Sequence, residues 1–190
     1  DIKTTGDFVA NNGYFQSGTT RGGSGGDILI KSGSMDVRNL SRIEAISRGS
    51  GSTGNIEVET GNLTLTQGGQ IRLTTYSSGN TGNLIVKADT VYITGAEDTT
   101  RPTSMHNIPN TGSTGRGGDV RLTVGILELR DAGQIYTTAY GSGPSGVVEV
   151  NADSVLLSGR NAFNAAAGIF SHAEGSGNSG GVRINTESLE

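Results

Sequence analysis

A repeat of about 28 residues runs through this chain and constrains its fold more than any other feature. Its clearest mark is a doublet of apolar residues separated by one position. The first member of the doublet recurs as Ile28, Ile56, Leu84, Val120, Val148 and Val182. Successive intervals are 28, 28, 36, 28 and 34 residues, so two turns carry insertions of 8 and 6 residues.

Two further apolar doublets follow in each repeat, such as Leu63/Leu65 and Ile71/Leu73. All three doublets have period 2, which is typical of strands with one buried face, and no segment keeps a helical spacing. Equivalent positions at fixed spacing predict a solenoid in which each strand pairs with its equivalent one turn away. We therefore expect an all-β parallel β-helix over residues 1–190, with six to seven turns of three short strands. Ile2, Val9 and Phe15 fit one further, degenerate turn, in which Asp7 falls at an apolar position.

The composition agrees with a rod that is one strand layer thick. Gly, Ser, Thr and Asn fill 88 of the 190 positions and hydrophobic residues only 32%, which would indicate disorder if the apolar residues were scattered. The chain has no Cys, so disulfides and thiolate metal sites are excluded. A net charge of -4 disfavours nucleic-acid binding, and no apolar run reaches the roughly 18 residues of a membrane helix.

One corner of the repeat carries Asn or Asp in successive turns, at Asp27, Asn55, Asn83 and Asp119. Gly22–Ile30 mimics a calcium-binding nonapeptide, but that motif requires tandem nine-residue repeats and here returns only once per turn. We expect a polar ladder of mutually bonded side chains at a tight glycine corner instead. We expect no metal and no cofactor.

Two sequence patterns alternate along the chain and resemble a known family. One is TG-x-L-x-L-x-x-G-x-Q-I at 60–71, and the other is AD-x-V-x-L-x-G at 152–159 and, with Ile93 in place of the Leu, at 88–95. These units resemble the repeats of filamentous-haemagglutinin-like bacterial exoproteins, the large two-partner-secretion adhesins, from about Asp27 onward. The resemblance implies a right-handed β-helix stalk, secreted to the extracellular space or the bacterial cell surface. It implies a structural or adhesive role rather than an enzymatic one.

The two insertions, residues 95–117 and 159–168, interrupt the connection between the second and third strands, so we expect both at the same edge of the rod. Loops on a rigid scaffold commonly carry recognition, and this edge is the predicted surface for a glycan or protein ligand. Its candidate contact residues are aromatic, Met and His side chains in or near the insertions, joined by two tyrosines that follow the third strand. These residues are Met105, His106, Phe163, Phe170, His172, Tyr76 and Tyr140.

Two other functions stay open. Parallel β-helices also host enzymes that cleave polysaccharides, which need clustered carboxylates on outward positions. The outward row Arg121, Glu149 and Arg183 is charged, yet no second carboxylate aligns beside Glu149, so an exposed ion-pair ladder is the favoured interpretation. Ice or mineral binding through Thr74/Thr75 and Thr137/Thr138 is weaker, because Ile46 and Ser47 break the row.

The sequence also shows no capping helix or polar cap at Asp1 or Glu190. A β-helix without caps exposes unpaired strand groups. We therefore expect a segment of a longer solenoid, or identical segments that self-associate end to end into a fibre.

Overall fold

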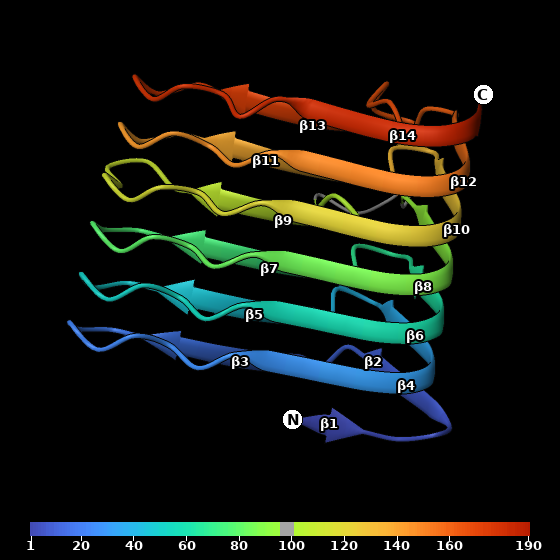
Figure 1. Cartoon of the computed structure of the whole chain (residues 1–190), viewed down its shortest axis with the longest axis horizontal. Helices are drawn as coiled ribbons and strands as arrows, with labels where there is room; N and C mark the ends of the chain where they lie inside the picture. The colour runs from blue at the N-terminus through green and yellow to red at the C-terminus, as the bar shows by residue number, and fades with distance from the viewer. Residues whose placement is uncertain (96–100) are drawn as a thin grey trace.

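The chain forms a parallel β-helix made of two sheets that run side by side along the rod (Figure 1). The computed structural model describes residues 1–95 and 101–190. The strands of sheet A are β1 (Ile2–Lys3), β2 (Asp7–Asn11), β4 (Ile28–Arg38), β6 (Ile56–Leu65), β8 (Leu84–Thr94), β10 (Val120–Arg130), β12 (Val148–Ser158) and β14 (Val182–Leu189). The strands of sheet B are β3 (Tyr14–Thr19), β5 (Arg42–Ser47), β7 (Gln70–Thr75), β9 (Ser104–Pro109), β11 (Gln134–Ala139) and β13 (Gly168–Ala173).

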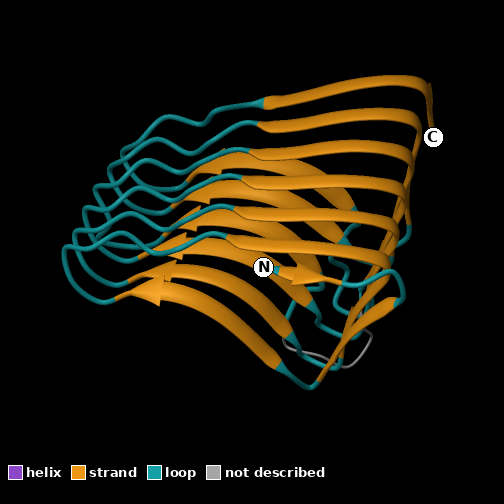
Figure 2. Ribbon diagram, turned by 60° about the horizontal axis from the view of Figure 1, so that its bottom comes forward, coloured by secondary structure: helices purple, strands orange, loops and turns teal. Residues whose placement is uncertain are grey.

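The first two predicted strands of each turn run together as one long strand that bends (Figure 2). Pairing between β4 and β6 runs to Ser32–Thr60 and resumes at Ser34–Asn62, so Gly33 marks the bend. A Cβ at Gly33 would lie 2.5 Å from the carbonyl oxygen of Thr5, which explains the need for glycine there. Each full turn thus contributes one bent strand to sheet A and one short strand to sheet B.

The predicted register of the apolar ladder is confirmed. Ile28 pairs with Ile56, Ile56 with Leu84, and Leu84 with Val120, and the series continues through Val148 to Val182. The first five of these side chains are at most 3% exposed and belong to one continuous core. The core therefore follows from stacking like on like, turn after turn.

The N-terminal turn departs from the predicted register by one residue in its middle. Ile2 and Phe15 pair with Ile30 and Ile43 as expected, but Phe8, not Asp7, pairs with Met35. An extra residue in the corner before β2 causes this shift, and a shift of one residue exchanges the two faces of a strand. The expected inward place of Val9 is therefore wrong, and Val9 is 53% exposed.

The turn that contains the longer insertion is more regular than the sequence suggested. Residues 104–109 form β9, in which Met105 pairs with Ile71 on one side and Ile135 on the other. In the preceding turn, Gln70 follows Leu65 by five positions. Their partners in this turn, Ser104 and Ile93, are eleven positions apart, so six of the eight inserted residues precede β9. The expectation that 95–117 is one exposed loop is wrong, and its residues 96–100 lie outside the described part.

The polar corner forms a ladder, as predicted, but its bonds run from side chain to backbone. Each Oδ1 atom accepts the amide N–H of the equivalent residue one turn later, at 2.7–2.9 Å. The acceptors are Asp27, Asn55, Asn83 and Asp119. The side-chain oxygen thus accepts a hydrogen bond from a backbone N–H that has no partner in the strand pairing. This need accounts for Asn or Asp at this position.

The glycine corners bring the backbones of neighbouring turns into direct contact. At Gly51, Gly79, Gly115, Gly143 and Gly177, a Cβ would lie within 1.9–2.1 Å of the carbonyl oxygen of the equivalent residue one turn earlier. Real Cβ atoms do not approach backbone oxygen so closely. The abundance of glycine is therefore a condition for stacking the turns.

The first prediction concerns this corner. Gly79→Ala forces two turns apart and should lower the free energy of unfolding by about 1–3 kcal/mol, as overpacking does. Gly23 is the matched control, because it stands at the same corner with nothing within 4 Å of its Cβ position. Urea unfolding of both variants measures the difference, and equal losses at the two sites would contradict direct backbone stacking.

Candidate functional site

The outer face of sheet B carries the most chemically diverse side chains described on the rod. Successive side chains of a strand point to opposite faces, so Met105 enters the core while Ser104 and His106 face outward. Despite facing outward, Ser104 is fully buried and His106 is only 3% exposed. Their burial arises because side chains from adjacent turns lie against one another along this face.

A Ser–His–Tyr cluster occupies the middle of the face. The Ser104 hydroxyl lies 2.9 Å from Nδ1 of His106, and its polar interaction with Tyr136 acts on the pKa of that tyrosine. The rings of His106 and Tyr136 stack, with centroids 4.9 Å apart and planes 14° from parallel. Burial raises the pKa of Tyr136 to about 12 and lowers that of His106 to about 3, with Arg72 and Arg42 assisting the second shift. Both rings are thus neutral and held in fixed positions.

The N-terminal part of the same face is charged. Glu44, whose side chain is fully buried, pairs with Arg72 at 2.5 Å and accepts a hydrogen bond from the hydroxyl of Tyr14. The guanidinium of Arg42 lies 5.7 Å from the centroid of the Tyr14 ring. A buried charge is costly unless it is paired and hydrogen-bonded, and these partners meet that need. These contacts join three consecutive turns.

A groove of about 320 Å³ opens at the C-terminal end of the face, over β11 and β13. These two strands are neighbours in sheet B (Figure 1). This volume lies at the lower end of the range for small-ligand sites. Tyrosine, phenylalanine, amide, hydroxyl, imidazole and carboxylate side chains line it. The lining residues are Gln134, Tyr136, Thr138, Tyr140, Phe170, His172 and Glu174.

Phe170 lies along its strand because of a glycine. A Cβ at Gly168 would be 2.4 Å from Cζ of Phe170, so the ring occupies the space of an outward side chain. In the neighbouring turns the same position holds Gln134 on β11 and Ser104 on β9. A side chain of either kind at position 168 would occupy the space that the Phe170 ring takes. The ring of Phe170 lies 5.6 Å from that of His172, tilted by 33°.

The structure brings together three of the seven predicted contact residues. Tyr140, Phe170 and His172 line the groove, and Tyr140 is 38% exposed. Tyr76 occupies the equivalent position two turns away, outside the groove, and the guanidinium of Arg48 lies 5.7 Å from its ring centroid. Phe163 is 70% exposed in the loop between β12 and β13, which does not line the groove.

The predicted contact role of Met105 and His106 in an exposed loop is wrong. Met105 is fully buried in the core, and His106 is covered by its neighbours. Sequence reasoning also missed Gln134, Tyr136 and Glu174. Tyr136 could have been found from the period of 2, because it follows the inward Ile135 and must therefore point outward.

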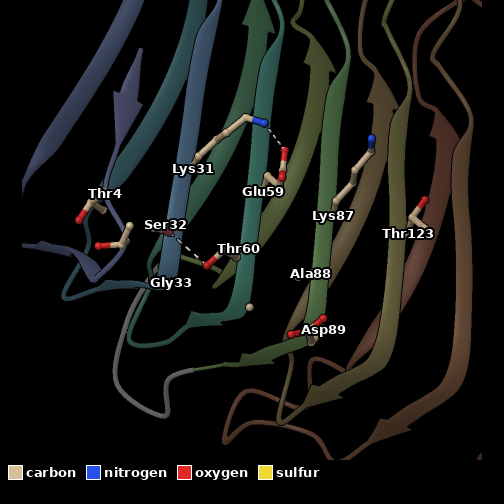
Figure 3. A pocket seen from close by; sticks show the side chains of 12 residues that line it. Thr4, Lys31, Ser32, Gly33, Glu59, Thr60, Lys87, Ala88, Asp89 and Thr123 are labelled. Carbon is tan, nitrogen blue, oxygen red and sulfur yellow. Dashed lines mark hydrogen bonds and ion pairs between the residues drawn. The ribbon is translucent and has the colours of Figure 1, made fainter.

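A second, larger groove of about 720 Å³ follows the bend of sheet A (Figure 3). Lys31, Glu59 and Lys87 stand on successive strands there, with Lys31 and Glu59 paired at 2.5 Å. The hydrogen bond and charge of Lys31 lower the pKa of Glu59. The groove continues past Thr123 into a further hollow of about 390 Å³. Its charges largely neutralise each other and it holds no aromatic ring among its lining residues, so the groove on sheet B is the stronger candidate.

Of the predicted outward charged row on sheet A, the structure forms the pair between Arg121 and Glu149, and Arg121 also pairs with Asp119, which lies outside that row. Arg121 lies 3.6 Å from Glu149 and 2.5 Å from Asp119. Arg121 is 44% exposed at its side chain, so each pair adds little to stability. In residues 1–95 and 101–190, no group of three or more His, Asp or Glu side chains is placed to hold a metal ion.

Comparison with known proteins yields no relative. No known family, no curated protein and no solved structure matches the chain. The part of the chain that the structure describes contains no helix long and apolar enough to cross a membrane.

The second prediction concerns His106. A histidine in the unfolded chain titrates near 6.5 and the folded pKa is about 3. Between these values the unfolded chain therefore binds more protons, and stability falls as the pH drops below 6.5. We expect His106 to lower the free energy of unfolding by roughly 2 kcal/mol from pH 7.5 to pH 5, at about 1.4 kcal/mol per pH unit.

Urea unfolding at a series of pH values measures this slope. His106→Gln should remove its part of the pH dependence, whatever the variant's stability at pH 7.5. An unchanged slope in this variant would show that His106 is not buried in its neutral form.

Proposed function

We propose that this chain is an adhesive β-helical stalk segment of an extracellular bacterial surface protein, and that the groove over β11 and β13 binds carbohydrate. The extracellular setting draws on the resemblance of the repeats at 60–71 and 88–95 to filamentous-haemagglutinin-like exoproteins. The binding role draws on the groove itself.

The observation that carries this proposal is the set of aromatic rings on rigid strands. Tyr136 is held by the stacked His106 ring and by Ser104, Phe170 by the space over Gly168, and Tyr140 stands 38% exposed at the end of β11. Sugar rings present C–H faces that pack on aromatic rings and hydroxyls that hydrogen-bond polar groups. Gln134, Thr138 and Glu174 supply those polar groups beside the rings.

Rigidity adds to the case for binding. The lining side chains stand on neighbouring strands whose register pairs Gln134 with Gly168 and continues to Ala139 with Ala173. A ligand that binds there does not have to order a loop, so little conformational entropy is lost.

The third prediction tests this role. Tyr140→Ala should weaken binding of an oligosaccharide by about tenfold, which corresponds to the loss of about 1.4 kcal/mol of ring contact. Tyr76→Ala is the matched control, because Tyr76 holds the equivalent position outside the groove. Calorimetric titration with a panel of neutral and charged tetrasaccharides measures the affinities.

Two results would overturn the proposal. One is the absence of binding by every tetrasaccharide of the panel at millimolar concentration. The other is an equal loss of affinity in Tyr76→Ala and Tyr140→Ala, which would place the binding outside the groove.

A further inference from the structure

The charges around the groove over β11 and β13 are one-sided. Glu174 is an exposed carboxylate among the lining residues, and no Lys or Arg is among them. Its charge reaches the neighbouring ring, because the pKa of Tyr140 is raised first by burial and then by Glu174. A ligand in this groove therefore meets a negative potential as long as the imidazole of His172, which also lines the groove, is neutral.

The aromatic rings act in the same direction. The faces of tyrosine and phenylalanine rings are electron-rich and attract cations within about 6 Å. Tyr136, Tyr140 and Phe170 therefore favour a positive group, and the Glu174 carboxylate supplies a counter-charge for it. An acidic saccharide would instead place its carboxylate against Glu174, which is unfavourable.

From this arrangement we propose that the groove selects saccharides that carry a protonated amine, that is, amino sugars without an N-acetyl group. This inference rests on the proposed carbohydrate binding and adds the class of sugar. The sugar ring packs on Tyr140 and Phe170, and its ammonium group donates hydrogen bonds to the Glu174 carboxylate. Gln134 and Thr138 contact the hydroxyl groups.

The fourth prediction compares three tetrasaccharides by calorimetric titration near pH 7 at low salt: the tetramers of glucosamine, N-acetylglucosamine and galacturonic acid. The glucosamine tetramer should bind about tenfold more tightly than the N-acetylated one, from one ion pair and the cation–π contacts. The galacturonic acid tetramer should bind most weakly. Added salt should reduce the preference for glucosamine.

Glu174→Gln should bring the affinities for the glucosamine and N-acetylglucosamine tetramers within about twofold of each other. The variant removes the ion pair, so only the weaker cation–π contacts with the rings still favour the glucosamine tetramer. The variant should keep its affinity for the N-acetylated tetramer, which separates loss of charge from loss of the groove. Glu57→Gln is the matched control, because Glu57 is an exposed carboxylate on the outer face of sheet A and should leave the preference unchanged.

The outcomes separate the two proposals. If N-acetylglucosamine or galacturonic acid binds as tightly as glucosamine and Tyr140→Ala weakens that binding, the amino-sugar preference is overturned while carbohydrate binding stands. If none of the three tetrasaccharides binds, the amino-sugar preference is overturned, and carbohydrate binding is overturned as well if the rest of the panel also fails to bind. A preference for glucosamine that survives in Glu174→Gln also overturns the assigned role of Glu174.

Discussion

In-register contact between the backbones of successive turns is the constraint on which the rest of this structure depends. Strands in a sheet lie about 4.8 Å apart, and this spacing must hold at the corners as well as along the strands. At the corners it removes room for a Cβ, so glycine recurs at Gly51, Gly79 and Gly115. Where strand pairing leaves a backbone N–H without an acceptor, an Asn or Asp side chain supplies it. The polar composition thus serves the stacking of the turns.

The same constraint explains the functional face. A side chain on the outside of one turn has its neighbours fixed about 4.8 Å above and below, so outward rows become contacts between successive turns. On sheet B these contacts pair Glu44 with Arg72 and stack His106 on Tyr136. Gly168 on β13 is the register partner of Gln134 on β11 and has no side chain, so the outward row of side chains is interrupted there. The ring of Phe170 lies over the strand in the space left free. The groove opens beside this interruption, over β11 and β13.

The repeat in the sequence predicted the solenoid, the apolar ladder and the polar corner because these depend on spacing alone. It did not predict that two doublets would share one bent strand, because a bend at Gly33 leaves the period of 2 intact on both sides. The core position of Met105 is not evident from the sequence, because the insertion before it obscures its register with Ile71. For the candidate site, the residue types near the insertions indicated Phe170 and His172, and the repeat indicated Tyr140 as the equivalent of Tyr76 after the third strand. Tyr136 and Glu174 were missed because a groove depends on neighbouring turns, whose insertions change the alignment.

The most direct test of this account measures the stacking itself. The chain has no cysteine, so two cysteines carrying spin labels can replace Leu29 and Arg183, which belong to one outward row of sheet A. Five strand spacings separate them, so the account predicts a single narrow distance distribution near 24 Å, that is, about 4.8 Å per strand. A broad distribution, or a mean distance much longer than this, would contradict the in-register parallel stack.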